Sequence, residues 1–99
     1  MIRLMASYPR SVDTHFDADY WLTTHMPLMS ANWPEVVRWE ADLGPDDGSN
    51  YGTAHMYFDS HESMAAAMGG AGTAAVLGDV ANYTNVQPVM VVNTVAATS

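Results

Sequence analysis

The sequence predicts an α+β fold in which a four-stranded antiparallel sheet carries two helices on one face. Apolar residues alternate with polar ones in some segments and recur every three or four residues in others. These segments follow one another in the order β-α-β-β-α-β, without repeats or low-complexity linkers. The 99 residues suffice for one such domain, spanning residues 1–99.

Four segments have the composition and spacing of strands. They are Ile2–Tyr8, Glu35–Leu43, Tyr51–Phe58 and Val86–Val95. Pro9 ends the first segment, because proline has no N–H for a sheet hydrogen bond. Pro88 indicates that the last strand either lies at an edge or begins near this residue. The segment Gly44–Asn50 is rich in Gly, Pro and Asp, which is typical of a loop.

The first helix is predicted to start at Asp17, a residue type favoured at helix N-caps. Phe16 and Trp21 are spaced to pack on each other as a hydrophobic staple across this helix start. Pro27 lies inside the helical run and cannot donate a hydrogen bond to the carbonyl of Thr23. We therefore expect the helix to bend or loosen after His25.

The second helix is predicted to be capped by Asp59 or Ser60 and to include Ser63–Met68. Three glycines then interrupt the helical pattern, which resumes over Thr73–Leu77. The resulting order is the split β-α-β, or ferredoxin-like, arrangement. Since both helices cover one face of its sheet, apolar side chains on the open face are expected to be buried in a homodimer.

Charge and composition exclude several functional classes. The net charge is −8, and only three arginines and no lysine are present, too few cations for binding nucleic acid or an anionic membrane surface. The absence of Cys excludes thiolate nucleophiles and iron–sulfur clusters, and the absence of Lys excludes Schiff-base chemistry. No cationic-then-apolar leader or long apolar run is visible, so a cytoplasmic location is expected.

Three groups of residues resemble the EthD family in order and spacing. They are Tyr8-Pro9 followed by Phe16-Asp17-x-x-Tyr20-Trp21-x-x-x-His25-Met26-Pro27-Leu28; then His55-x-Tyr57-Phe58-Asp59-Ser60-x-Glu62; and finally Gly78-Asp79-Val80-x-Asn82-Tyr83-Thr84-x-x-x-Pro88. Together they span nearly the whole chain. The sequence departs from the common family pattern at Met64–Gly72, which is rich in Ala and Gly, so a short second helix and a more mobile pocket wall are expected there.

The resemblance implies a dimeric α+β barrel, in which two sheets pack face to face, with a pocket between sheet and helices in each subunit. Members of the family are often described as reductases or degradation-pathway proteins. The wider superfamily includes cofactor-free monooxygenases, cyclases, decarboxylases and haem enzymes, so the fold does not fix the reaction.

His25 is the first candidate catalytic residue, because histidine exchanges protons near neutral pH and this one shares a helix face with Trp21. A structural alternative is a buried histidine bonded to the Thr23 carbonyl. Tyr8, at a strand end, could donate to a developing oxyanion or simply pack. Asp79 could orient His25 or a substrate hydroxyl, although Asp and Asn82 in this position commonly cap helices or form turns.

Candidate substrate-binding residues are aromatic or lie beside the catalytic candidates. They are Tyr20, Trp21, His55 and Tyr83. Trp33, Trp39 and the methionines could complete an aromatic ligand pocket or form ordinary core. His55 and Tyr57 share one face of the third predicted strand. On the helix side they would line the pocket, and on the other side they would belong to the dimer interface, which is the slightly favoured location for Tyr57.

No metal or cofactor is expected, because no recognised ligand spacing connects the four histidines. His61-Glu62 begins a zincin motif, but Ala65 occupies the position of its second histidine. The favoured function is a cofactor-independent enzyme that performs acid/base or oxidative chemistry on a small aromatic or polyketide-like molecule. The alternatives are a non-catalytic protein that holds such a metabolite for a partner enzyme and, third, a haem or flavin protein with His25 as a ligand.

Overall fold

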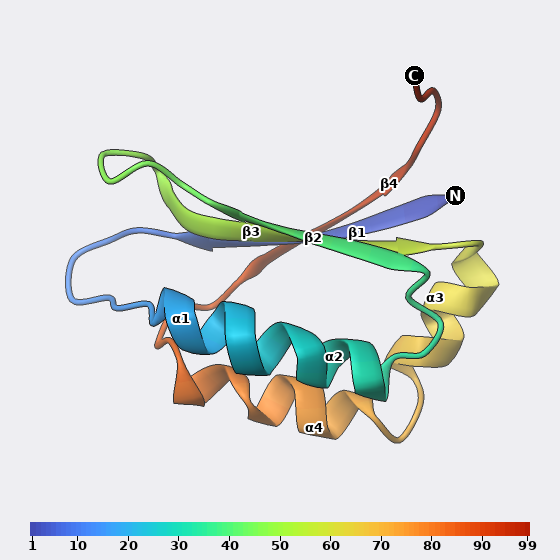
Figure 1. The fold of residues 1–99 in the computed structure, drawn as a ribbon, viewed down its shortest axis with the longest axis horizontal. Coiled ribbons are helices and arrows are strands. Elements are labelled where there is room, and N and C mark those ends of the chain that lie inside the picture. The colour runs from blue at the N-terminus through green and yellow to red at the C-terminus, as the bar shows by residue number, and fades with distance from the viewer.

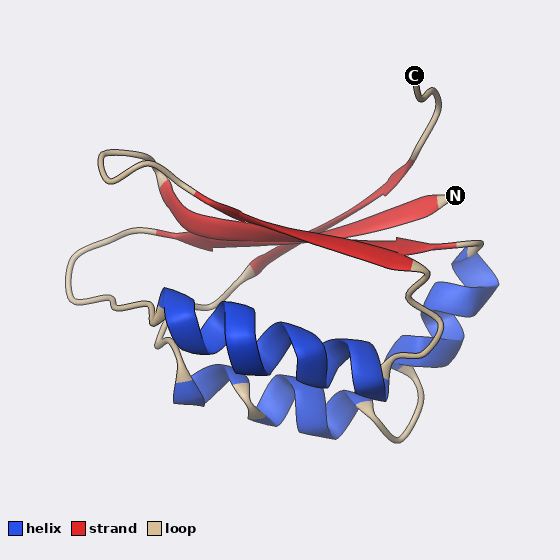
Figure 2. Cartoon of the chain, viewed as in Figure 1, coloured by secondary structure: helices blue, strands red, loops and turns tan.

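The computed structural model describes residues 1–99 and contains one four-stranded antiparallel sheet. Its strands are β1 (Ile2–Pro9), β2 (Arg38–Leu43), β3 (Asn50–Phe58) and β4 (Val89–Thr94). Their spatial order is β2-β3-β1-β4, so the first strand is central and the last lies at an edge. All helices lie on one side of the sheet, which confirms the ferredoxin-like prediction (Figures 1 and 2).

The first helical run comprises α1 (Ala18–Tyr20), η1 (Trp21–His25) and α2 (Met26–Asn32). The Asp17 side chain accepts a hydrogen bond from the Tyr20 backbone N–H, as expected of an N-cap. The rings of Phe16 and Trp21 lie 5.1 Å apart between centroids, which confirms the predicted staple at the start of the run.

The distortion that Pro27 causes in the helix lies closer to the N-terminus than predicted. It falls on η1, where the chain forms a π-helical turn and the Met26 N–H donates to the carbonyl of Trp21. A proline ring collides with the carbonyl four residues before it, so the distortion spreads toward the N-terminus, whereas the sequence analysis placed it after His25. Such π turns are frequent at functional sites, and this one ends on His25.

The second helical run is divided, as its glycines predicted. It consists of α3 (His61–Met68), α4 (Thr73–Gly78) and the short 3₁₀ turn η2 (Val80–Asn82). Ser60, not Asp59, is the N-cap of α3, and it accepts from the backbone N–H of Ser63. No single helix has the length and apolar character of a membrane span, and the one pair that reaches this length together is bent by 66°.

The core lies between the helices and the sheet. Along β1 every second side chain is buried, and these side chains pack against Met26, Met29 and Trp33. Trp21 is fully buried and lies directly on β3 at Gly52, where an added Cβ would be 2.9 Å from the indole ring. A glycine at this position thus allows the indole ring to approach the sheet closely.

The open face of the sheet is more polar than the sequence analysis expected. The strand register places on it Arg3, Met5, Ser7, Arg38, Glu40, Asp42, Thr53, His55, Tyr57, Val89, Val91 and Asn93. Arg38 lies 4.0 Å above the ring of Tyr57, whose hydroxyl donates to Glu40. Apolar exposure is instead concentrated on the edge strand β4, where Val89–Val92 are each 43–53% exposed. A run of four exposed apolar residues at a sheet edge is typical of an interaction surface.

Candidate active site

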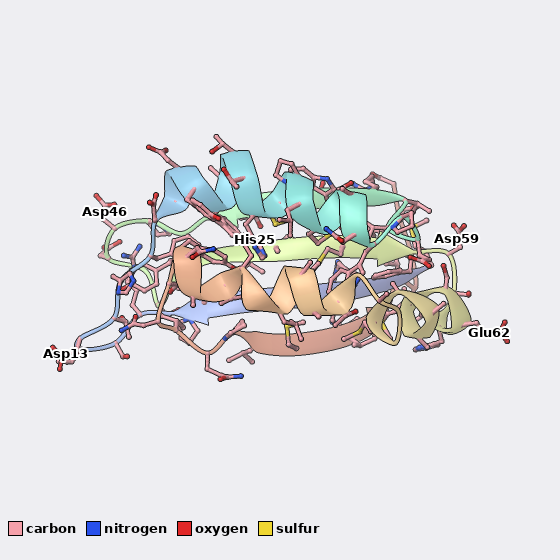
Figure 3. All side chains as sticks on the ribbon, turned by 90° about the horizontal axis from the view of Figure 1, so that it is seen from below. Asp13, His25, Asp46, Asp59 and Glu62 are labelled. Carbon is pink, nitrogen blue, oxygen red and sulfur yellow. The ribbon has the colours of Figure 1, made fainter.

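His25 and Asp79 form a buried pair across the two helical runs. The Nδ1 atom of His25 lies 2.9 Å from Oδ2 of Asp79, and the residues are 4% and 8% exposed. His25 ends the π turn, and Asp79 is the C-cap of α4, 54 residues later in the sequence. Figure 3 shows His25 in the interior between these runs, with the labelled acidic side chains at the periphery.

Two further hydrogen bonds hold the Asp79 carboxylate in place. The hydroxyl of Tyr20 and the amide of Asn82 both donate to Oδ1, at 2.7 and 2.9 Å. Burial acts to raise the pKa of Asp79, but the hydrogen bonds from Tyr20, Asn82 and His25 together keep it below its usual range. Asp79 is therefore ionised at neutral pH and can only accept, so the Nδ1 atom of His25 carries the proton in this bond.

This arrangement leaves Nε2 as the reactive nitrogen of His25. In the neutral ring, a proton on Nδ1 makes Nε2 a proton acceptor, and no hydrogen bond within the chain occupies it. A carboxylate that fixes the tautomer and stabilises the imidazolium is the usual partner of a histidine base. The Thr23 carbonyl considered in the sequence analysis is not the partner of His25.

The hydroxyls of Tyr8 and Tyr83 form a second buried hydrogen bond beside this pair, with 2.7 Å between the oxygens. The ring of Tyr83 packs against the imidazole of His25, with 4.5 Å between centroids. Burial raises the pKa of both phenols, so each keeps its proton at neutral pH. Tyr83 thus connects the His25–Asp79 pair with Tyr8 at the end of β1.

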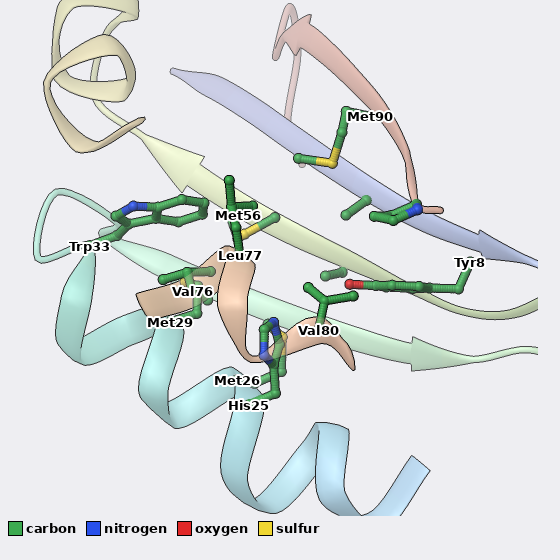
Figure 4. A pocket seen from close by; sticks show the side chains of 13 residues that line it. Tyr8, His25, Met26, Met29, Trp33, Met56, Val76, Leu77, Val80 and Met90 are labelled. Carbon is green, nitrogen blue, oxygen red and sulfur yellow. The ribbon is translucent and has the colours of Figure 1, made fainter. Parts of the chain in front are cut away.

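A small apolar cavity of about 40 Å³ lies against His25 and Tyr8 (Figure 4). Of its 13 lining residues 11 are hydrophobic, and they include the methionines Met26, Met29, Met56 and Met90. This volume is on the order of that needed by one water molecule, far below the roughly 300–1,000 Å³ of pockets for drug-sized ligands. Entry of a larger ligand requires the walls to repack, and unbranched methionine side chains adapt readily to such changes.

The structure brings together most, but not all, of the residues that the sequence suggested. His25 and Tyr8 line the cavity, while Asp79, Tyr20 and Tyr83 lie behind them and hold them in place. Trp21 is core and does not line the cavity, because its ring packs between Tyr8, Phe16 and β3.

His55 lies outside the cavity, on the face of the sheet opposite the helices. Its Nε2 atom is 2.7 Å from a carboxylate oxygen of Asp42. The sequence left the face of this strand open, so the register corrects the suggestion that His55 contacts the substrate, and it places Tyr57 on the same outer face.

Asn82 is a residue of the site that the sequence analysis treated only as part of a turn. Its amide reaches Asp79 three residues earlier, across the short turn η2. The spacing of Asp79, Asn82 and Tyr83 was the available signal, but it is equally common in ordinary helix ends. No group of three or more His, Cys, Asp or Glu side chains is close enough together to hold a metal ion.

Comparison with known proteins identifies relatives among solved structures. No protein-family model matches the chain, and no curated protein matches it significantly. An EthD-like protein from Ralstonia eutropha superposes with a TM-score of 0.83 and 28% identity, over 97% of this chain and 92% of that one. The chain is similar to this EthD-like protein in both fold and sequence. An EthD family protein from Bacillus halodurans has a TM-score of 0.70 and 21% identity, with 95% and 97% coverage.

Other structures share the fold of this chain at lower identity. SnoaB, a cofactor-independent oxygenase from Streptomyces nogalater, has a TM-score of 0.72 and 14% identity, over 98% of this chain and 94% of that one. A dimeric protein of ferredoxin-like fold from Bacteroides fragilis has a TM-score of 0.63 and 10% identity, over 93% of each chain. The fold therefore occurs both in an enzyme that needs no cofactor and in a dimer.

Proposed function

We propose that this EthD-like chain is a cofactor-independent enzyme in which His25 acts as a general base on a small aromatic or polyketide-like molecule. The observation that supports the proposal is the buried pair of His25 and Asp79 beside an apolar cavity. Asp79 holds Nδ1, so the ring presents a basic nitrogen whose tautomer is already set. Proton transfer by a positioned histidine accelerates reactions by about 10²–10⁴.

The apolar walls favour such chemistry, because charges interact more strongly where water is excluded. Removal of a proton from an activated C–H or O–H bond leaves an electron-rich substrate anion. In an oxidative variant this anion would itself reduce dioxygen, so the protein would need no redox cofactor of its own. The similarity in fold to a cofactor-independent oxygenase is compatible with this variant.

Deuterium exchange tests the proposal without knowledge of the natural substrate. The chain is incubated in D₂O with uncharged aryl ketones such as β-tetralone, and loss of the acidic α-proton is followed by NMR. We expect saturable exchange that is faster than in buffer of the same pH and composition. Saturable ligand binding without faster exchange, across ketones and phenols, would overturn the enzyme proposal and favour the alternative of a metabolite-holding protein.

We also propose that the chain is a homodimer through the open face of its sheet. Both charge signs are present there: Arg3 and Arg38 lie on the same face as Glu40 and Asp42, so two copies can pair opposite charges when rotated against each other. Sedimentation at micromolar concentration is expected to give twice the 10.7 kDa mass of one chain, and a mass of one chain would contradict the dimer.

A further inference from the structure

The hydroxyl of Tyr8 belongs to a side chain that lines the cavity, and it is bonded to a second phenol. Its single hydrogen bond joins it to Tyr83, and Tyr8 lines the cavity whereas Tyr83 does not (Figure 4). Burial raises the pKa of both groups; the bond between them then lowers the pKa of Tyr8 and raises that of Tyr83 further. Either hydroxyl can donate in this bond. When Tyr83 donates and Tyr8 accepts, the proton of Tyr8 is free to point into the cavity that Tyr8 lines.

The cavity holds two kinds of polar group and no cation. Tyr8 supplies a hydroxyl donor and His25 a basic nitrogen, while 11 of the 13 lining residues are hydrophobic. The three arginines lie elsewhere: Arg3 and Arg38 on the open face, and Arg10 bonded to the carbonyls of Gly48 and Pro45. The nearby Asp79 carboxylate and the net charge of −8 repel anions. A carboxylate or phosphate would therefore lose its hydration in this cavity without gaining a counter-ion.

We infer that the site takes an uncharged enolisable carbonyl compound, whose oxygen is bound by Tyr8 with Tyr83 as positioning residue, while His25 removes the adjacent α-proton. The inference rests on the proposed function and specifies its substrate class. In the step, the α C–H bond breaks and its proton moves to Nε2 of His25. The electron pair forms a C=C bond, and the carbonyl oxygen becomes an enolate that accepts the Tyr8 hydrogen bond. The proton on Nε2 is replaced by one from solvent, and transfer of that solvent-derived proton to the α-carbon completes exchange. In a conjugated enolate, return of a proton from Nε2 to the more distant carbon completes isomerisation.

The hydrogen bond to Tyr8 gives Tyr83 a role distinct from packing. As Tyr8 donates to the developing enolate, negative charge shifts onto its oxygen, and the bond from Tyr83 stabilises that charge. Tyr83→Phe keeps the ring against His25 and removes only this donor. Tyr8→Phe likewise keeps the ring and removes the donor to substrate. Hydrogen bonds to charged groups contribute about 1.5–3 kcal/mol, which corresponds to a factor of about 10 to 100 in rate.

Two measurements with β-tetralone test the inference. The first is the exchange rate, which we expect to fall about 10- to 100-fold in Tyr8→Phe and by a smaller factor in Tyr83→Phe, mainly in kcat and with little change in KM. The second is the infrared C=O stretch of the bound ketone, which is expected at lower frequency than in an apolar solvent. It should return toward the solvent value in Tyr8→Phe and partway in Tyr83→Phe. Tyr51→Phe, a phenol bonded to Thr14 away from the cavity, is the matched control and should change neither quantity.

The outcomes separate this inference from the proposed function. The wild-type chain could exchange the α-proton while Tyr8→Phe alters neither the rate nor the C=O stretch. In that case the inferred role of Tyr8 and Tyr83 in binding the carbonyl oxygen is wrong, and the proposal that His25 is the base stands. If the C=O stretch shifts as expected but no exchange occurs, the base proposal fails while the carbonyl site stands. A β-tetralone derivative bearing a carboxylate is expected to bind at least about tenfold more weakly than the ketone. Equal or tighter binding of that anion would overturn the uncharged substrate class.

Discussion

Replacing His25 with glutamine is expected to lower the rate of α-proton exchange on an uncharged ketone by a factor of about 10²–10⁴. Glutamine can keep a hydrogen bond to the Asp79 carboxylate through its amide, but it has no nitrogen that accepts a proton near neutral pH. The loss should appear in kcat more than in KM, because the cavity walls that bind the ketone are unchanged. The measurement is exchange in D₂O followed by NMR over a range of ketone concentrations.

The chain offers a matched histidine for comparison. His61 is the first residue of α3 and is exposed, so His61→Gln changes the same side chain away from the cavity. We expect this variant to exchange the ketone at the wild-type rate. Thermal melting monitored by circular dichroism shows whether His25→Gln remains folded. A folded His25→Gln protein with wild-type exchange would exclude His25 as the base.

The succession of strands and helices could be read from the sequence because each depends on local spacing. Alternation identified β1, whose buried side chains recur at every second residue, and Asp17 marked the start of the first helix. The face occupied by His55 could not be read in this way, because alternation separates two faces without telling which one meets the helices. The polar character of the open face depends on the register of three strands and is equally invisible in any one of them.

The residues of the site could be predicted from the sequence, but the hydrogen bonds that join them could not. His25 and Asp79 could be named as candidates from residue type and family resemblance, but they are 54 residues apart, and only the packing of the two helical runs joins them. The π turn was not foreseen, because Pro27 predicts a distortion without its form or exact place. The hydrogen bond between Tyr8 and Tyr83 spans 75 positions and likewise follows only from the tertiary fold.

Replacing Asp79 with asparagine is expected to lower the exchange rate by a factor of up to about 10⁴. The shape is nearly unchanged, but an amide facing Nδ1 of His25 can donate, which favours the tautomer with its proton on Nε2. The nitrogen that should accept the substrate proton is then occupied, and the imidazolium formed in the reaction loses its carboxylate partner. Wild-type exchange in a folded Asp79→Asn protein would show that the carboxylate does not orient the base.

The same substitution has an expected effect on stability that depends on pH. Hydrogen bonds outweigh burial and lower the pKa of Asp79 in the folded chain below its ordinary value of 3.8. At pH values above 3.8 the ionised carboxylate therefore stabilises the fold. This contribution is lost as the pH falls through the lowered pKa. Near pH 7, Asp79→Asn should reduce the free energy of unfolding by about 1–3 kcal/mol, since the donors from Tyr20, Asn82 and His25 lose a charged acceptor.

The free energies of unfolding of the wild type and of Asp79→Asn should become more similar in acid, because a protonated Asp79 resembles asparagine in charge and shape. His25 and Tyr20 are hydrogen-bonded to this side chain, so the comparison reports the charge of Asp79 together with its bonds to these partners. Urea unfolding of both proteins between about pH 7 and about pH 2 measures this difference. A difference that stays constant over this range would mean that the Asp79 charge does not stabilise the fold, and it would remove the argument that a buried carboxylate holds His25 ready to accept a proton.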